Sequence, residues 1–228
     1  MSAIFRNLLK VTIPISVRQK IRIIQKAVVY CLRRQSIRVP VAFGKPVKII
    51  IGAAMTHQAG WHSTNQQWLD IVLKDHWQRV FRGKALLTHV LAEHVFEHLT
   101  ANETREALRL VVLHMRPGGH IRIAVPDGYH PDPVYLLHVG IAGVGADAED
   151  HKQLFNCDLL MKYLSEAGFL PELQEGYLSN GELVQRPLIA EAGLVIRSRS
   201  NTENKAGRTG WDFVDAQTSL VVDGRLPA

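Results

Sequence analysis

Apolar runs and segments with helical periodicity alternate along the chain from residue 47 onward. Apolar runs at residues 47–51, 85–92 and 120–125 predict buried strands. Apolar positions three and four residues apart predict a helix at residues 75–81 and another that begins after Thr100. This alternation is typical of an α/β sheet with parallel strands. Further elements are predicted at residues 61–64, 169–174, 194–199 and 219–223 as strands, and at residues 155–167 as a helix.

The boundaries of two helices carry recognisable signals. Thr100 followed by Glu103 has the spacing of a capping box, so we expect a helix to begin there. The Arg-Pro-Gly-Gly segment at residues 116–119 is expected to end that helix and to lead directly into the strand at 120–125. Gly168 is expected to close the helix at 155–167.

The amino-terminal part of the chain has a different pattern. Val17, Ile21, Ile24 and Val28 recur at helical spacing, and basic residues fill much of the space between them, which predicts a basic amphipathic helix over residues 17–34. Two prolines bound residues 40–46, which we interpret as a linker. The predicted organisation is therefore an amino-terminal extension, residues 1–44, followed by one folded domain, residues 45–228.

Charge separates along the chain in the same way. The first 69 residues contain eleven Lys or Arg and no acid, whereas the rest contains 16 basic and 21 acidic residues. The whole chain has a formal net charge of +6. A basic arm on an acidic body favours an anionic partner such as lipid headgroups or nucleic acid, although a solvated helix without a partner has the same pattern. The two cysteines, Cys31 and Cys157, form neither a disulfide framework nor a metal motif, so a cytoplasmic location is expected. No run of eighteen uncharged apolar residues is present to span a membrane.

A small-residue loop follows the first predicted strand. Gly52, Ala53 and Ala54 come directly after it, at the edge of the sheet where ligands bind in doubly wound folds. Asn65 follows the second predicted strand and could hold two hydroxyl groups through its amide. The loop lacks both the G-x-G-x-x-G pattern and the P-loop lysine, which argues against a phosphate cradle.

The segment after the strand at 85–92 contains several ionisable residues. His94-x-x-Glu97-His98 has the spacing of a zinc hydrolase motif, which requires both histidines on one face of a helix. The preceding residues instead predict a strand, so we expect no metal site and keep a zinc hydrolase only as an alternative. Glu93 and His94 would then lie at the carboxyl end of a central strand, where a ligand is contacted.

A third group of polar residues follows the strand at 120–125. Asp127 lies at the end of that strand, and His130 and His151 come after it. Carboxylate and imidazole groups near a ligand edge can accept a proton from a substrate, so these three residues are candidate general bases.

In combination, these segments resemble class I S-adenosylmethionine-dependent methyltransferases. The resemblance rests on Glu-His-Val-Phe-Glu-His-Leu at residues 93–99, Arg-Pro-Gly-Gly-His-Ile-Arg-Ile-Ala-Val-Pro-Asp at 116–127 and Glu-Ala-Gly-Phe at 166–169. It is similar more narrowly to a bacterial group of predicted methyltransferases, and it covers residues 47–225. It implies a Rossmann-like doubly wound sheet of the class I methyltransferase type, preceded here by the basic helical extension.

The same resemblance implies S-adenosyl-L-methionine as cofactor. Matched to the family pattern, Gly52 and Ala53 fall in the cofactor loop and Asn65 near the position that holds the ribose. Asp70 falls near the loop that flanks the adenine, and Glu93 and His94 follow the fourth strand of that pattern. The sequence departs from the pattern in its Gly-Ala-Ala loop and in the amide at the ribose position.

We therefore expect a methyltransferase that acts on a small molecule or on a cell-envelope saccharide or lipid. Residues 16–35 would contact an anionic membrane, which places the protein in the cytoplasm or peripherally at the inner membrane face. No Asn-Pro-Pro-Tyr or Asp-Pro-Pro-Tyr motif of DNA amino-methyltransferases occurs. The alternative from a different class is a non-catalytic binding or scaffold protein on a degenerate methyltransferase fold.

Overall fold

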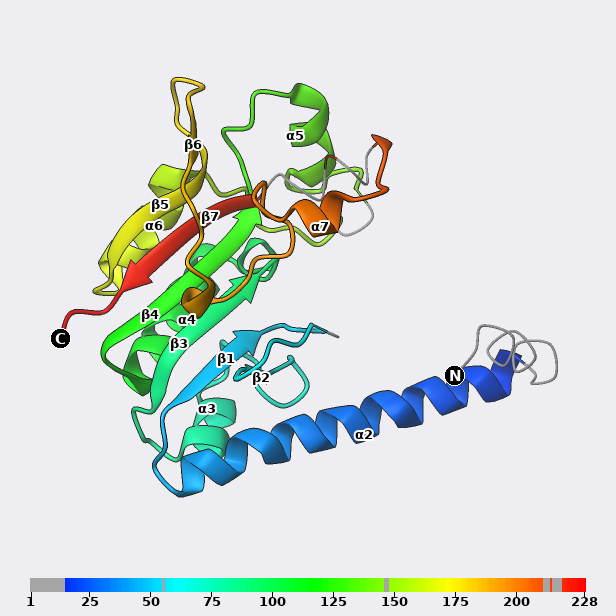
Figure 1. The fold of residues 1–228 in the computed structure, drawn as a ribbon, viewed down its shortest axis with the longest axis vertical. Helices are drawn as coiled ribbons and strands as arrows, with labels where there is room; N and C mark the ends of the chain where they lie inside the picture. The colour runs from blue at the N-terminus through cyan, green and yellow to red at the C-terminus, as the bar shows by residue number, and fades with distance from the viewer. Residues whose placement is uncertain (1–14, 55, 146–147, 211–213, 215–218) are drawn as a thin grey trace.

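The computed structural model describes residues 15–54, 56–145, 148–210, 214 and 219–228. Its centre is a seven-stranded sheet with the strand order β2-β1-β3-β4-β7-β5-β6 (Figure 1). The strands are β1 (Val47–Ile51), β2 (His62–Ser63), β3 (Leu87–Glu93), β4 (Met115–Pro126), β5 (Leu170–Tyr177), β6 (Leu183–Gln185) and β7 (Ser219–Arg225). The helices are α2 (Ile15–Ala42), α3 (Lys74–Phe81), η1 (Phe96–His98), α4 (Ala101–His114), α5 (Pro133–Val139), α6 (Cys157–Glu166), η2 (Ala190–Ala192) and α7 (Thr202–Lys205).

Strand direction follows the predicted α/β pattern over most of the sheet. β2, β1, β3 and β4 pair in parallel, which confirms a Rossmann-like α/β sheet. β7 is an exception to the predicted parallel arrangement, because it pairs antiparallel with both β4 and β5. Ser219 pairs with Pro126, so β7 starts at the edge of the sheet where β4 ends and must run in the opposite direction.

One face of the sheet is covered by helices α3, α4 and α6, which lie behind it in Figure 1. Trp77 and Phe81 of α3 stack on each other and pack against His114 of α4 within the main hydrophobic core. The predicted capping box of α4 is confirmed: Glu103 N–H donates to Thr100 Oγ1, and Thr100 N–H donates to the Glu103 carboxylate. α4 ends at His114, before the Pro-Gly-Gly segment, which belongs to β4.

The opposite face is covered by residues 186–201, here called the crossing segment, which passes in front of the sheet in Figure 1. Its Val195 packs with Ile50, Leu91 and Val221 in a second, smaller core. A strand was predicted at residues 194–199, and this prediction is wrong. The backbone N–H groups of Ile196 and Arg197 donate to the side chain of Glu93 rather than to a neighbouring strand.

A buried ion pair fixes the crossing segment to the sheet. Arg122 of β4 is fully buried and donates two hydrogen bonds of 2.7 Å to the carboxylate of Asp223 on β7. Its remaining nitrogen donates to the backbone carbonyls of Ile189 and Gly193, at 3.0 and 2.6 Å. One guanidinium therefore connects two strands and the segment that lies over them.

Helix α2 packs on the domain through its carboxyl-terminal turns and extends away from it at the other end (Figure 1). Ile37 and Val41 are buried in the main core, whereas Ile23, Ile24 and Leu32 are exposed. The predicted linker at 40–46 is corrected, because α2 continues through Pro40 to Ala42. Burial of Val41 holds this last turn against the domain. Among the described residues, no helix is long and apolar enough to cross a membrane.

The Arg122–Asp223 pair leads to a prediction for stability. Asp223→Ala would leave the buried Arg122 guanidinium without its counter-charge, so we expect the free energy of unfolding to fall by about 3–5 kcal/mol. The control is Glu106→Ala on α4, which removes the exposed pair between Glu106 and Arg109 and should change that free energy by less than about 0.5 kcal/mol. Urea unfolding of both variants measures the two values, and equal losses would contradict the assignment.

A second prediction concerns pH. Burial, together with the charges of Lys48 and His120 on the adjacent strands, lowers the pKa of His89 to about 4. Between its ordinary value of 6.5 and about 4, the unfolded chain binds a proton at His89 and the folded chain does not. The free energy of unfolding should therefore fall as pH drops through this window. His89→Gln should flatten that dependence in urea titrations, whereas His57→Gln, at an exposed histidine, should leave it unchanged.

Candidate functional site

A cavity of about 760 Å³ opens at the carboxyl ends of β1, β3 and β4. This is the edge of a doubly wound sheet at which ligands bind. Four parts of the chain form its wall: the loop after β1, the segment after β3, residues from 138–145 and 148–151, and the crossing segment with residues that follow it. Lining residues include Gly52, Ala53, Ala54, Glu93, His94, Glu97, His98, Pro126, Asp150, His151, Ile196, Arg197, Asn204 and Arg208.

The loop after β1 is held in a tight conformation. Gly52 has φ +60°, and a Cβ at this position would lie 2.5 Å from Val95 Cγ2, so only glycine fits. Ala53 N–H donates to Thr64 O at 2.9 Å, and Arg33 of α2 donates to Ala54 O at 2.6 Å. The predicted cofactor residues Gly52 and Ala53 therefore line the cavity on a backbone fixed from both sides.

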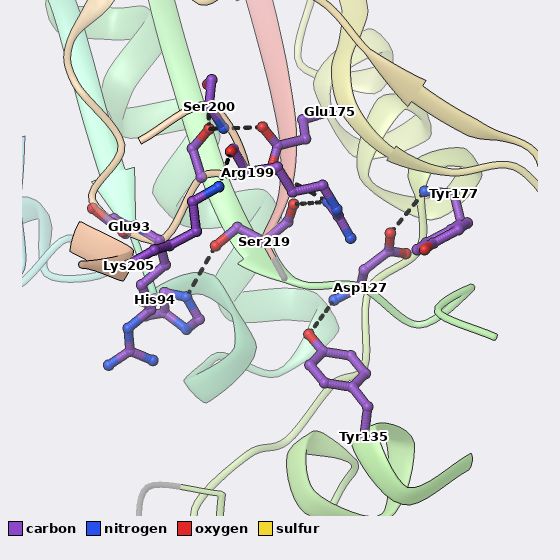
Figure 2. Close-up of polar contacts among 12 residues, drawn as sticks. Glu93, His94, Asp127, Tyr135, Glu175, Tyr177, Arg199, Ser200, Lys205 and Ser219 are labelled. Carbon is purple, nitrogen blue, oxygen red and sulfur yellow. Dashed lines mark hydrogen bonds and ion pairs between the residues drawn. The ribbon is translucent and has the colours of Figure 1, made fainter. Parts of the chain in front are cut away.

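Glu93 marks the end of β3 and connects the cavity wall to the crossing segment. One of its oxygens accepts from Ile196 N–H at 2.9 Å and the other from Arg197 N–H at 2.7 Å. Glu175 of β5 holds the next residues of the crossing segment in the same way. It accepts hydrogen bonds from Ser198 Oγ and from Arg199 N–H, both at 2.7 Å (Figure 2). The two carboxylates hold consecutive turns of the same irregular backbone, but only Glu93 lines the cavity.

His94 is fixed by an unusual backbone conformation. Its φ is +53°, and its N–H donates to Ala124 O on β4. Nε2 lies 3.3 Å from Ser219 Oγ, as Figure 2 shows, and Nδ1 lies 3.0 Å from Glu97 Oε1. Burial acts to raise the pKa of Glu97, but the charge and hydrogen bond of His94 outweigh it and hold that pKa below its usual value.

The zinc hydrolase arrangement predicted as an alternative is not formed. Residues 96–98 make a single 3-10 turn, and α4 begins only at Ala101, so His94 and His98 do not share the face of a helix. The structure instead brings His151 to Glu97 and His98: one ligand atom from each lies within 4.8 Å of the others. No local sequence pattern relates His151 to the other two residues.

Asp127 lies at the end of β4 but does not line the cavity. Its two carboxylate oxygens accept from Tyr129 N–H at 3.0 Å and from Tyr177 N–H at 2.8 Å, and its own N–H donates to Tyr135 Oη (Figure 2). Burial raises the pKa of Asp127, and these two donors oppose the rise. The residue is thus engaged in joining β4 to the end of β5.

The other two candidate bases lie in different cavities. His130 lines a second cavity of about 440 Å³, together with Tyr177 and Arg199. Burial, followed by the charge of Arg199, lowers the pKa of His130. His151 is buried and lines the first cavity, so it is the one candidate base placed beside Glu93 and His94.

Asn65 and Asp70 are not among the residues that line either cavity. The Asn65 side chain is buried, and neither of its polar atoms has a hydrogen-bond partner. The Asp70 carboxylate accepts from Val72 N–H at 3.1 Å and from Gln66 Nε2 at 3.3 Å. The sequence did not indicate Arg197, Asn204 and Arg208, because Arg197 and Arg208 lie on irregular backbone and Asn204 lies in the four-residue helix α7, which is too short to show a periodicity.

Comparisons with known proteins give structural likeness only. No family model matches the chain, and no curated protein matches its sequence. The structure is similar to a SAM-dependent methyltransferase from Archaeoglobus fulgidus, with 13% identity, coverage of 88% of this chain and 94% of that chain, and a TM-score of 0.45. It is also similar to a possible histamine N-methyltransferase from Thermotoga maritima, with 12% identity, coverage of 90% and 96%, and a TM-score of 0.44.

A third similar structure is the 1,6-didemethyltoxoflavin-N1-methyltransferase of Burkholderia thailandensis, with bound 1,6-didemethyltoxoflavin and S-adenosylhomocysteine. Its identity is 16%, the match covers 86% of this chain and 77% of that chain, and the TM-score is 0.42. The mixed seven-stranded sheet with its flanking helices has the Rossmann-like doubly wound arrangement that the predicted fold class stated.

Proposed function

We propose that the protein is an S-adenosylmethionine-dependent methyltransferase whose cofactor lies in the cavity of about 760 Å³. The observation that carries this proposal is the position of that cavity, at the carboxyl ends of β1, β3 and β4 of a doubly wound sheet. Its volume falls within the range of roughly 300–1,000 Å³ found for small-molecule sites.

The charges on the wall fit this cofactor. S-adenosylmethionine carries a positive sulfonium, a positive ammonium and a negative carboxylate. The cavity presents the carboxylates of Glu93 and Glu97 and the guanidinium groups of Arg197 and Arg208. Although both oxygens of Glu93 already accept one N–H, a carboxylate has about four acceptor positions and can accept further hydrogen bonds. We assign cofactor contacts to Gly52, Ala53, Glu93 and His94, and none to Asn65 or Asp70.

The chain's own task in such a reaction is mainly alignment. The cofactor, when bound, supplies a methyl group already activated by the positive sulfur. The protein must hold the acceptor in line and exclude water. His151 is the candidate to accept the proton of the acceptor: its Nδ1 lies 2.8 Å from Val139 O, which can only accept, so Nδ1 is the donor and a neutral ring keeps Nε2 as an acceptor.

For the acceptor, we propose a small molecule or a cell-envelope saccharide or lipid. Support for an envelope acceptor comes from α2, whose exposed Ile23, Ile24 and Leu32 accompany the basic residues of the segment 16–35. A helix with exposed apolar and basic side chains can bind an anionic membrane surface. Because Arg33 of the same helix donates to Ala54 O, contact at α2 would occur close to the cavity wall.

A second candidate function is a non-catalytic binding protein on this fold. It is favoured by one observation: the position predicted to hold the ribose, Asn65, does not line the cavity, and its amide is buried without a partner. The cofactor titration described next separates this candidate from the enzyme.

Isothermal titration with S-adenosylmethionine and S-adenosylhomocysteine tests the cofactor assignment. We expect micromolar binding to the wild-type protein and at least about tenfold weaker binding of S-adenosylmethionine to Glu93→Gln, which removes a negative charge from the wall. Glu175→Gln is the matched control, because Glu175 also holds the crossing segment but does not line the cavity. Its affinity should stay close to that of the wild type.

Two results of this titration would argue against the proposal. An equal loss in both variants would mean that the crossing segment, and not the Glu93 carboxylate, determines the affinity. Absence of binding at millimolar cofactor would favour the non-catalytic alternative.

Membrane contact is tested by sedimentation with phosphatidylglycerol vesicles. Replacing Ile23, Ile24 and Leu32 by Asn removes apolar surface that a membrane would bury, so we expect at least about tenfold weaker binding. The control replaces Leu170 and Ile189, which are equally exposed on the domain, and should bind as the wild type does. Unchanged binding of the α2 variant would rule out residues 16–35 as the contact.

A further inference from the structure

We propose that Glu97, His98 and His151 form a binding site for a divalent transition metal, with zinc as its best-matched ion, in one corner of the large cavity. The sequence predicted no metal site. This proposal is independent of the cofactor assigned above, because it rests on three side chains whose geometry needs no S-adenosylmethionine.

The three ligands converge from separate parts of the chain. Glu97 and His98 come from the η1 turn after β3, and His151 comes from the turns that follow α5. One ligand atom from each lies within 4.8 Å of the others. Tetrahedral zinc with bonds of about 2.0–2.1 Å places its ligand atoms about 3.4 Å apart. Side-chain rotations that bring these ligand atoms about an ångström closer together would close the site around an ion.

Glu97 is a buried carboxylate with an incomplete set of partners. Its side chain is 1% exposed, and neither carboxylate oxygen accepts a well-aligned hydrogen bond. His94 Nδ1 lies 3.0 Å from Oε1 and offsets the burial of the carboxylate from that side. A divalent cation on the side facing His98 and His151 would give the carboxylate the second partner that the described residues do not supply.

Both histidines are oriented as metal ligands usually are. His98 Nδ1 lies 2.9 Å from Asp150 Oδ1, and His151 Nδ1 lies 2.8 Å from Val139 O. Metal-bound histidines typically donate their second N–H to a carboxylate or a backbone carbonyl, which fixes the ring and its tautomer. His151 makes such a hydrogen bond to Val139 O, whereas His98 Nδ1 faces Asp150 Oδ1 at ion-pair distance without hydrogen-bond alignment. Nε2 is therefore the atom that each ring would offer to an ion.

The ligand set indicates the class of metal and the use of the site. Two imidazoles and one carboxylate are the protein ligands of many catalytic zinc sites, which keep a further position open. The residues line the cavity, so the open position would face its interior. If the proposed methyltransferase function holds, a metal there would bind an acceptor oxygen and lower the pKa of its hydroxyl, the task otherwise left to His151.

Metal binding is measured on the full chain after treatment with a chelator and dialysis. We expect one equivalent of Zn²⁺ to bind with micromolar or tighter affinity by calorimetry, and one equivalent of Co²⁺ to give the absorption bands of tetrahedral coordination. Glu97→Gln and His151→Ala should each weaken zinc binding at least about a hundredfold. His57→Ala, which removes an exposed histidine that does not line the cavity, should bind as the wild type does.

A variant at an exposed residue keeps the test valid if the variants of the buried Glu97 and His151 fail to fold. Asp150 has a side chain that is 69% exposed, so Asp150→Asn should fold normally and weaken zinc binding about 10- to 100-fold by removing the group that orients His98. The proposal is overturned if the wild type binds no zinc at micromolar concentration, or if the Glu97, His151 and Asp150 variants all bind as His57→Ala does. S-adenosylmethionine binding is measured in a separate titration of the zinc-free protein. Failure of the zinc assignment can therefore be distinguished from failure of the cofactor assignment.

Discussion

The structure depends on charged side chains that rise from the sheet and satisfy the backbone of the crossing segment. An irregular segment that lies over a sheet pairs only some of its own N–H and C=O groups, and leaving the others buried without partners would be costly. Arg122 donates to the carbonyls of Ile189 and Gly193, while Glu93 and Glu175 accept the N–H groups of the residues that follow. Because Asp223 neutralises Arg122, the sheet can bury this guanidinium and use it as a fixed point for the chain above.

This arrangement also determines the shape of the cavity. Ile196 and Arg197, which are held by Glu93, form one side of it, and the turn at Gly52 forms another. Glu93 therefore has two tasks, since the same carboxylate orders the wall and carries charge into the cavity. A change in its contacts with a ligand would be felt along the crossing segment, because the two hydrogen bonds share the same oxygens. A ligand bound at Glu93 would therefore be coupled to the local order of the crossing segment.

Strand positions and helix starts that depend on neighbouring residues were predicted correctly from the sequence. Apolar runs located β1, β3 and β4, and the pairing of Thr100 with Glu103 located the start of α4. The Glu-His segment was correctly placed at the end of a strand. Contacts between distant residues left no such signal. The antiparallel direction of β7 follows from its start beside Pro126, at the edge of the sheet where β4 ends. The apolar Leu194 and Val195 suggested a strand, although neighbouring N–H groups donate to a carboxylate. The meeting of His151 with Glu97 depends on the whole path between them.

The carboxylates of Glu93 and Glu97 are only four residues apart but have opposite surroundings. This difference is the reason that we propose a different ligand for each. Glu93 receives two backbone N–H groups, which spread partial positive charge over both of its oxygens. Glu97 is more deeply buried and receives no well-aligned donor. His94 lies between them, and its positive φ turns its ring so that Nδ1 faces Glu97 and Nε2 faces Ser219. Glu97, which lacks a well-aligned hydrogen-bond donor, thus faces the corner with His98 and His151, where we propose a small dication. Glu93, whose charge is shared by two N–H groups, suits a larger, weakly solvated cation such as a sulfonium.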